Sequence, residues 1–466
     1  MKKNCFFGAG DAEKERLTQK LSQSLINSTE EELLHIIEDY DAVMGDEGLE
    51  GLRKAYENEA SFTMRKDQQA ITDYVVRHLK DQLENPRPEI IVISGGPGTG
   101  KTIVGIRFIL EYISLFNDGK NDNKAIFCLP KSQTVKAMFD AACAVDEENE
   151  KEYCCYLQEI GREQNMVVVD EAHRITNLES TLDQVFEKGT KLLILLQDDH
   201  QLVRPGEQGT FEAFRDYAGS RGIDFSPISQ EDKRTLTLVD EKRCDENLLN
   251  VITKFFYDAN LEITVPIGSI KVFNALDDLV AWKNRESENS RTKYILPFCW
   301  RWNSRYQNSG EDIVIDDLRL TWNPEDTDDQ VIWLNDASDD RAACIYTSQG
   351  LDMDNVAFIW WDDLVWDEGS SSWKGNPTKL YDPAFRCEKD SRSGLWCQTR
   401  WDSYSKKFKR VENGYRLSQE EMSKLIMNTY YVMLTRPRKS IGIWIENEVT
   451  KRHVMDILGI AAEEDK

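Results

Sequence analysis

One glycine-rich segment constrains the fold of this chain more than any other feature. Residues 95–102 read Gly-Gly-Pro-Gly-Thr-Gly-Lys-Thr, directly after the β-branched apolar run Ile90–Ile93 and before an apolar helical pattern at 103–110. In such a loop consecutive backbone N–H groups point inward at phosphate oxygens, which requires residues without a bulky Cβ or with freedom at positive φ. The following helix presents its N-terminus to the negative charge. We therefore expect an α/β fold with a triphosphate site at the end of a buried strand.

The loop predicts the ligand as well as the fold. Lys101 is expected to bridge the β- and γ-phosphates of ATP, and Thr102 to place its hydroxyl on Mg²⁺. A chance glycine-rich turn is the alternative, but the motif is complete and has the right strand before it and helix after it. The residues expected to form the remaining backbone cradle are Gly95, Gly96, Pro97, Gly98, Thr99 and Gly100.

Two further buried-strand candidates end in acidic residues. Met166–Val169 runs into Asp170 and Glu171, so we expect Asp170 to hold Mg²⁺ and Glu171 to orient and deprotonate the attacking water. A helix N-cap followed by a first-turn acid is the alternative interpretation of this pair. Leu192–Leu196 leads to Gln201, whose amide is a candidate sensor of the γ-phosphate. The histidines that follow both acidic clusters are interpreted as hydrogen-bonded connectors.

Composition narrows the class of protein. The chain has 466 residues, enough for two or three packed units, and no apolar run long enough for a membrane helix. Ten cysteines without regular spacing favour free thiols in a reducing cytosol, so a cytoplasmic protein is expected. The net charge of −25 argues against non-specific coating of nucleic acid but permits a local basic channel. Acidic residues concentrate in 1–60 and 311–340, whereas the basic cluster Lys406–Arg410 is interpreted as a solvated loop.

The spacing of apolar runs predicts how the chain is divided. Strand candidates in the first half are Ile90–Ile93, Ala125–Leu129, Met166–Val169 and Leu192–Leu196, which predicts a parallel sheet with helices on both faces. A second α/β unit is predicted from strand candidates at 293–296, 331–334, 342–346, 356–361 and 441–445 and a helix near 419–434. The expected regions are an acidic helical segment 1–60, a first lobe 61–240, a second lobe 241–450 with an irregular excursion 362–418, and a tail 451–466.

The order of the motifs resembles that of superfamily 1 helicases, and specifically a bacterial DNA/RNA helicase domain related to the Schlafen helicase module. The resemblance covers about residues 62–446 and implies two RecA-like P-loop domains. Besides the motifs above, the segments that carry it are Glu241–Cys244, Thr347–Asp352 and Tyr431–Arg438.

The resemblance also implies roles for individual residues. Gln68 resembles the glutamine that reads the adenine edge, with Gln69 as a close rival. Arg243 and Arg436 resemble two arginine fingers that stabilise the transferring phosphoryl group from opposite sides of an interdomain cleft. Asp352 takes the place of a ribose-side acid that is more often Glu.

Contacts to nucleic acid are implied less specifically. Lys131 or Ser132 falls where the family contacts a backbone phosphate, and Arg438 or Lys439 can form a phosphate contact or a solvated turn. Candidates for base stacking, at least half of which are expected to be core residues, are Trp300, Trp302, Trp360, Trp361 and Trp366. A long accessory domain is not evident in the sequence.

Two functions from different classes follow. The first is an ATPase that translocates on single-stranded DNA or RNA, and the resemblance suggests phage defence or restriction as its setting. The second is an ATP-driven protein-assembly switch without strand translocation, whose partner binds the acidic segments 1–60 and 311–340. Stimulation of ATP hydrolysis by single-stranded nucleic acid distinguishes the two.

Overall fold

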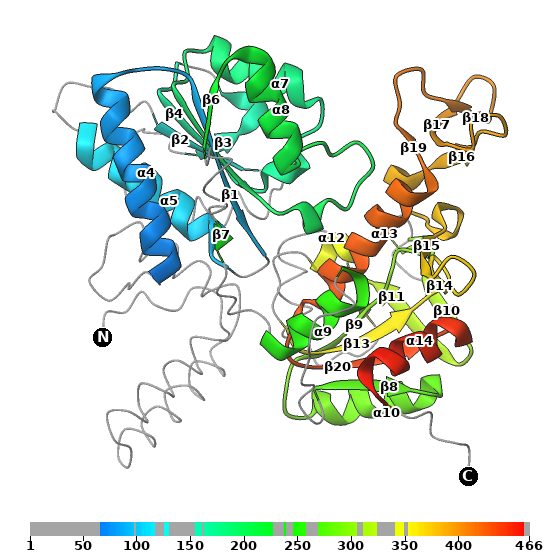
Figure 1. The fold of residues 1–466 in the computed structure, drawn as a ribbon. Helices are drawn as coiled ribbons and strands as arrows, with labels where there is room; N and C mark the ends of the chain where they lie inside the picture. The colour runs from blue at the N-terminus through cyan, green and yellow to red at the C-terminus, as the bar shows by residue number, and fades with distance from the viewer. Residues whose placement is uncertain are drawn as a thin grey trace, which may run out of the picture.

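The computed structural model describes most of the chain outside its N-terminal region. The described residues are 66–96, 99–116, 125–129, 154–160, 163–226, 237–238, 246–257, 269–304, 311–323, 341–348 and 353–460. The predicted acidic helical segment 1–60 and the predicted strand 331–334 lie outside them. Figure 1 shows two α/β units, each built on its own sheet, which confirms the predicted fold class. None of the described helices is long and apolar enough to span a lipid bilayer.

The first sheet is parallel throughout, in the order β3-β2-β4-β5-β1-β6, with β7 also paired to β1. Its central strands are short apolar runs that are buried on both faces, which is the pattern of strands covered by helices. All four strands predicted for this half are confirmed. The strands are β1 (Glu89–Gly95), β2 (Ala125–Leu129), β3 (Cys154–Tyr156), β4 (Met166–Val169), β5 (Leu192–Gln197), β6 (Asp224–Ser226) and β7 (Thr237–Leu238).

Helices cover both faces of this sheet (Figure 1). On one face lie α4 (Lys66–Glu84) and α5 (Lys101–Phe116), and on the other α7 (Leu178–Glu187) and α8 (Phe211–Arg221). Gly105 lets α5 approach the sheet closely, because a Cβ at this position would lie 2.6 Å from the ring of Phe127 and 2.7 Å from Leu196. This close packing fixes the start of α5 against the ends of the central strands.

The second sheet has the order β10-β11-β12-β9-β13-β20-β8, and every pairing except the antiparallel β10–β11 hairpin is parallel. The expectation of a strand over 342–346 is wrong at its end, because the strand stops at Ala343 and the next residues turn into helix α12 (Ile345–Ser348). The strands are β8 (Ile270–Phe273), β9 (Thr292–Ile295), β10 (Ile313–Ile315), β11 (Leu318–Trp322), β12 (Arg341–Ala343), β13 (Met353–Trp360) and β20 (Pro437–Ile445).

The helices of the second unit pack on both faces of its sheet. α9 (Glu246–Phe256), α13 (Gln419–Leu434) and α14 (Glu448–Leu458) share one core, and α10 (Leu276–Ser287) shares the other. The helix predicted near 419–434 is confirmed, and Ser418 opens it with a reciprocal capping box. The expected boundary between 450 and 451 is wrong, because α14 crosses it and buries Val454 and Met455 in the core.

The excursion 362–418 is not irregular, because it contains two small antiparallel sheets. The first is a hairpin of β14 (Leu364–Asp367) and β15 (Ser372–Gly375). The second is formed by β16 (Cys387–Lys389), β17 (Trp396–Asp402), β18 (Lys407–Arg410) and β19 (Arg416–Leu417). Residues 383–417, called the β module below, project beyond the N-terminal end of α13 in Figure 1. The expectation of a loop at Lys406–Arg410 is therefore wrong from 407 onward.

Candidate nucleotide site

The glycine-rich loop joins β1 to α5, as its sequence predicts. Lys101 is the first residue of α5, and its buried ammonium Nζ donates to the carbonyl oxygens of Gly95 at 2.6 Å and Gly96 at 3.0 Å. Gly100 has a φ of 81°, in the left-handed region that favours glycine. The positive end of α5 and the Lys101 charge thus lie at the same edge of the sheet, where an anion is stabilised.

Gln68 on α4 contacts this loop. Its Nε2 donates to the Thr99 carbonyl at 3.2 Å, and the Thr99 hydroxyl donates in turn to the Gly96 carbonyl at 2.9 Å. Gln68 is buried, whereas its rival Gln69 is exposed and donates to Asp73 at 2.8 Å, one turn along the same helix. The structure therefore ties Gln68, and not Gln69, to the loop, while its role at an adenine stays a prediction.

Thr102 and Asp170 meet although 68 residues separate them in the sequence. The Thr102 hydroxyl donates to Asp170 Oδ2 at 2.6 Å, and Asp170 Oδ1 accepts the Glu171 N–H at 3.0 Å. Burial and the neighbouring charge of Glu171 raise the pKa of the Asp170 carboxyl to about 6, although Thr102 and Lys101 favour its ionised form. A hydroxyl and a carboxylate at the mouth of a phosphate loop are hard oxygen donors, which fit Mg²⁺.

Glu171 occupies a strained backbone conformation. Its φ of 49° and ψ of 41° lie in the left-handed region, which is costly for a residue with a side chain and occurs preferentially at functional sites. His173 on the turn η2 (Ala172–Arg174) places Nε2 3.0 Å from Glu171 Oε2. Burial alone would raise the pKa of the Glu171 carboxyl, but the adjacent His173 ring lowers it below the usual range. Glu171 is therefore a carboxylate at neutral pH.

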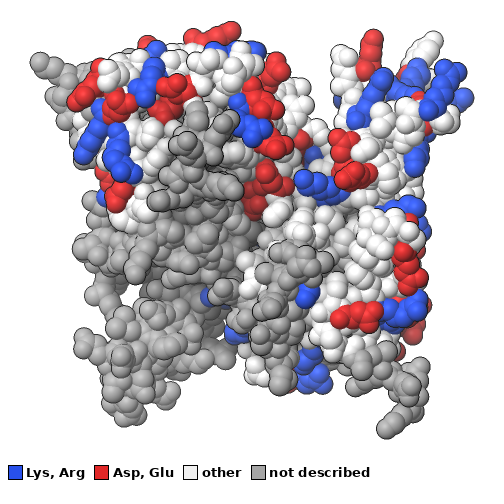
Figure 2. Space-filling model, in the orientation of Figure 1, with Lys and Arg blue, Asp and Glu red and all other residues white. Residues whose placement is uncertain are grey.

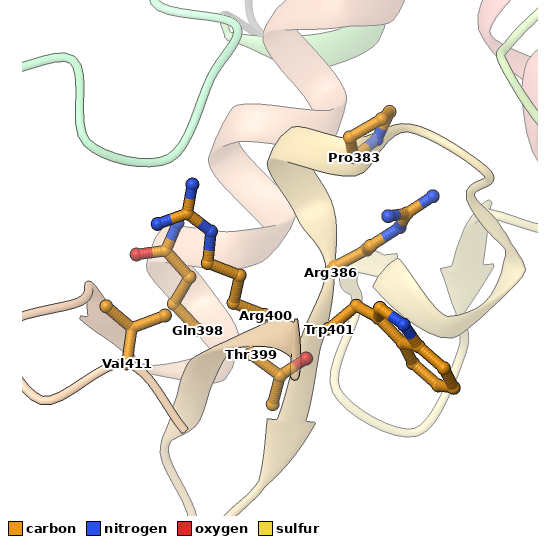
Figure 3. A pocket seen from close by; sticks show the side chains of 7 residues that line it. All are labelled: Pro383, Arg386, Gln398, Thr399, Arg400, Trp401 and Val411. Carbon is orange, nitrogen blue, oxygen red and sulfur yellow. The ribbon is translucent and has the colours of Figure 1, made fainter. Parts of the chain in front are cut away.

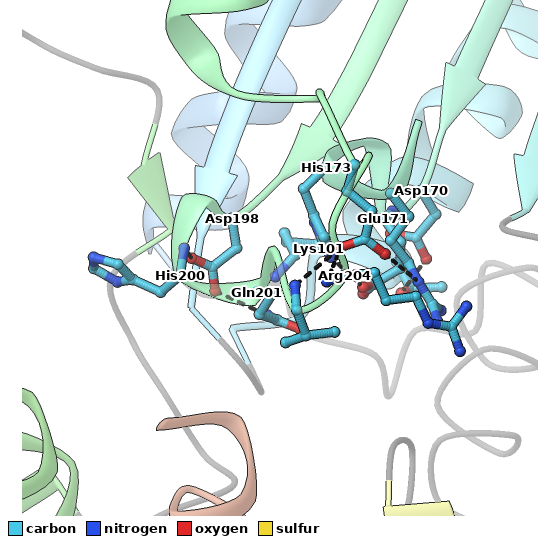
Figure 4. Close-up of polar contacts among 12 residues, drawn as sticks. Lys101, Asp170, Glu171, His173, Asp198, His200, Gln201 and Arg204 are labelled. Atoms are coloured by element: carbon cyan, nitrogen blue, oxygen red, sulfur yellow. Dashed lines mark hydrogen bonds and ion pairs between the residues drawn. The ribbon is translucent and has the colours of Figure 1, made fainter. Parts of the chain in front are cut away.

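The acidic segment after β5 lies beside these groups, as Figure 4 shows. Asp198 Oδ1 accepts the backbone N–H of His200 at 2.9 Å, and Asp198 Oδ2 accepts Gln201 Nε2 at 2.8 Å. Gln201 is buried on the turn η3 (Asp199–Gln201), so its amide orientation is fixed by Asp198. Its predicted role as a γ-phosphate sensor stays a prediction.

The same segment also contacts the second unit, which sequence reasoning missed. Asn428 of α13 donates through Nδ2 to the carbonyl oxygens of Leu202 at 2.8 Å and Asp199 at 3.3 Å. The ring of His200 stacks on Tyr257 with 4.1 Å between centroids, and the Tyr257 hydroxyl donates to Asn428 Oδ1 at 2.6 Å. His200 therefore belongs to the contact between the two units, and nothing in its sequence context marks this partner.

A second missed contact follows directly along the chain. The Arg204 guanidinium lies over the Tyr346 ring of α12, 4.2 Å from its centroid, and the Tyr346 hydroxyl donates to Asp382. Glu207 holds this loop, because its Oε2 accepts the backbone N–H groups of Val203 at 2.9 Å and Arg204 at 3.1 Å. The only sequence signal here is the turn dipeptide after Arg204, Pro-Gly.

Arg436, a predicted arginine finger, follows α13 and is buried, with Nε donating to the Val432 carbonyl at 2.8 Å. Its catalytic role stays a prediction. Other predicted residues lie outside the described part of the chain, and these are Pro97, Gly98, Lys131, Ser132, Arg243 and Asp352.

The tryptophans proposed for base stacking mainly support packing. Trp360 is fully buried and donates Nε1 to the Leu364 carbonyl at 2.7 Å, and Trp302 is also buried. Trp300 and Trp361 pack against each other with centroids 4.7 Å apart, and Trp366 stacks on His453. The expectation that at least half are core or packing residues therefore agrees with their positions.

Three solved structures show limited similarity to this chain. An arterivirus nonstructural protein 10 (helicase) is 10% identical with a TM-score of 0.35, over 79% of this chain and 61% of that one. Its complex with DNA gives 11% identity and a TM-score of 0.36, over 79% and 63%. AMPPCP-bound DnaA from Aquifex aeolicus is 16% identical with a TM-score of 0.22, over 44% and 56%. The chain thus spans less than two thirds of the length of these proteins.

Sequence comparison gives the assignment. No protein of curated function matches the chain. The model of the Schlafen group 3 DNA/RNA helicase domain matches residues 88–447, which include both sheets, the phosphate loop and the segment after α13. The chain therefore belongs to the Schlafen group 3 DNA/RNA helicase domain family.

Proposed function

We propose that the chain hydrolyses ATP with Mg²⁺ and that single-stranded DNA or RNA stimulates this hydrolysis. The bond of 2.6 Å between the Thr102 hydroxyl and Asp170 carries the proposal, because it joins the phosphate loop to the acidic end of β4. A hydroxyl and a carboxylate in this arrangement are the protein ligands that a nucleotide-bound Mg²⁺ requires. Mg²⁺ bound there would neutralise charge on the β- and γ-phosphate oxygens.

The protein groups divide the chemistry between them. Lys101 and the backbone N–H groups of the loop bind the phosphates and offset their charge. Glu171, ionised and held by His173, orients a water molecule and takes its proton as the water oxygen bonds to the γ-phosphorus. The bond from the γ-phosphorus to the bridging oxygen breaks, and ADP leaves with the electron pair. Arg243 and Arg436 are proposed to offset the charge on the transferring group.

Movement along a nucleic-acid strand is proposed to arise from changes in the relative position of the two units. The segment 198–207 supports this, because it begins at the acidic end of β5 and contacts Asn428 and Tyr346 of the second unit. A change at the nucleotide is thereby passed to α13 and α12. Phage defence is the biological setting that the family resemblance suggests, and the biochemical proposal is independent of it.

The test is ATP hydrolysis by the full chain, with and without single-stranded DNA and RNA oligonucleotides. We expect severalfold stimulation by at least one polymer, no activity for Lys101→Ala, and a loss of about 100-fold or more for Glu171→Gln with ATP binding retained. Glu212→Gln, an exposed acid on α8, is the matched control and should hydrolyse ATP normally.

Each contrary outcome is specific. Absence of hydrolysis by the wild-type chain would refute the enzymatic proposal. Hydrolysis that neither DNA nor RNA changes would refute strand dependence and favour the protein-assembly switch. The acidic segment 311–340 motivates that second candidate, and its described part, 311–323, carries Glu311, Asp316 and Asp317 as exposed acids beside the β10–β11 hairpin.

A further inference from the structure

The β module, residues 383–417, differs in charge from the rest of the chain. It carries nine Lys or Arg against four Asp or Glu, whereas the whole chain has a net charge of −25. Figure 2 shows Lys and Arg side chains gathered where the module projects. A basic surface on an otherwise acidic protein has a locally positive electrostatic potential, which attracts an anionic partner.

The module also exposes large aromatic side chains. Trp401 and Phe408 face each other across β17 and β18, with centroids 5.1 Å apart, and remain 49% and 52% exposed. The Arg386 guanidinium lies 5.8 Å from the centre of the Phe408 ring, and Tyr404 in the connecting turn is 97% exposed. These four groups present planar faces to solvent, and their exposed faces do not contribute to core packing.

Cations lie on both faces of this hairpin. Arg386 lies beside the Phe408 ring, whereas Arg400, Lys407 and Lys409 lie on the face opposite the rings, because successive side chains of a strand alternate between faces. Arg400 lies opposite Lys409 in the strand register, and Lys407 lies opposite Asp402. Asp402 forms an ion pair with Lys409, while no carboxylate in the described part of the chain pairs with Arg400 or Lys407. A pocket of about 460 Å³ lies beside β17, and Figure 3 shows Arg386, Arg400 and Trp401 among the residues that line it.

We propose that the β module binds single-stranded nucleic acid, with bases stacking on Trp401 and Phe408 and a phosphate contacting Arg386 beside them. The proposal rests on the proposed function and adds a binding surface outside the nucleotide site. Proteins that hold single strands combine an aromatic platform with a positive surface, because every base has a stacking face and every phosphate a charge. An acidic protein segment would use the cations but not the aromatic faces.

Lysines on an edge strand also prevent sheets from pairing with one another, and β18 is such an edge. That role accounts for Lys407 and Lys409. It does not account for half-exposed Trp401 and Phe408 at the same position, because exposed aromatics on an edge promote association. The joint presence of both residue types therefore favours nucleic acid.

The test is binding of a fluorescently labelled dT oligonucleotide of about 20 nucleotides to the full chain, at several salt concentrations. We expect Trp401→Ala and Phe408→Ala each to weaken binding about tenfold, from the worth of one stacked base. Arg386→Gln should weaken binding and make its salt dependence shallower by about 0.7, because one phosphate contact is lost.

Matched controls lie on exposed residues outside the module. Tyr381→Ala removes an aromatic side chain that is 54% exposed, and Lys374→Gln with Arg452→Gln removes two cations that are 57% and 64% exposed. Both variants should bind the oligonucleotide like wild type. ATP hydrolysis without nucleic acid should be the same in all of these proteins.

An abasic oligonucleotide of the same length separates stacking from charge. Wild type should bind it about tenfold more weakly than dT, while Trp401→Ala should bind the two with more similar affinity. If wild type binds dT and the module variants bind it equally well, the inference is overturned and the proposed function stands. If wild type binds no nucleic acid, the proposed function fails as well. If wild type binds the dT and abasic oligonucleotides equally well, and poly-glutamate displaces dT as effectively as unlabelled dT does, the module binds acidic polymers and the proposal is wrong.

Discussion

Asn428 is the residue whose loss should most weaken the contact between the two units. It lies on α13, is 1% exposed, and makes three hydrogen bonds. Two of them reach backbone carbonyls of the segment that follows β5, and the third accepts the Tyr257 hydroxyl. Asn428→Ala removes all three and leaves the Leu202 carbonyl buried without this donor.

The expected loss is roughly 3–5 kcal/mol in the free energy of unfolding, from about 1 kcal/mol for each of the two bonds to half-buried groups and about 1–3 kcal/mol for the buried Leu202 carbonyl left unpaired. Alanine is the better helix former, by a few tenths of a kcal/mol, so propensity acts in the opposite direction. A net loss therefore measures the contact and not the helix.

Urea unfolding followed by tryptophan fluorescence tests this expectation. Thr429→Ala is the matched control, because its hydroxyl donates only to the Leu425 carbonyl of the same helix among the bonds described. We expect Asn428→Ala to unfold at lower urea and in two steps, since the units lose their cooperative contact. A single transition that coincides with that of the control within about 0.5 kcal/mol would refute the reasoning.

Two further predictions concern stability. Gly209→Ala should destabilise the chain strongly, because its Cβ would lie 2.0 Å from the Ala172 carbonyl oxygen. Gly219→Ala, at an exposed position of helix α8, meets nothing within 4 Å and should stabilise the chain by about 0.5–1 kcal/mol. Thermal melts compare the two variants, and equal shifts in melting temperature would contradict the prediction. Burial raises the pKa of Asp363 to about 7 despite the Tyr430 hydroxyl that donates to it, so the folded state retains a proton that the unfolded chain releases near pH 4. Stability should therefore fall as pH rises from about 4 to about 7, and Asp363→Asn should flatten this slope in urea titrations; an unchanged slope would assign it to other groups.

The first sheet and its site were predictable because their signals are local. β2 and β4 begin and end where the apolar runs Ala125–Leu129 and Met166–Val169 do, since a strand buried on both faces reads as a continuous apolar segment. Parallel strands bring their carboxyl ends to one edge, so the Thr102–Asp170 contact followed from two motifs 68 residues apart. Chemistry that depends on strand ends is therefore visible in the sequence.

The β module and the contact between the units were not predictable in this way. The strands of the β module have two to seven residues, and β18 is exposed at every position, so no buried face imposes an apolar pattern. The apolar segment 342–346 resembles a strand, but the Thr347 hydroxyl accepts the Cys344 N–H at 3.1 Å and closes a turn at the start of α12. Asn428 and His200 find their partners only once both sheets are packed.

The length of α13 has a mechanical consequence. The helix has 16 residues, about 24 Å at 1.5 Å per residue, with the β module before its first residue and Arg436 just beyond its last. Asn428, docked on the other unit, lies nine residues from Gln419 and six from Leu434, so the two arms of the helix measure about 14 Å and 9 Å. A rigid rod pivoting at Asn428 moves its two ends in opposite directions, and each end moves in proportion to the length of its arm. A shift of Arg436 towards a phosphate would thus swing Gln419 the other way, and the β module beyond it, with Trp401 and Phe408, by a larger amount.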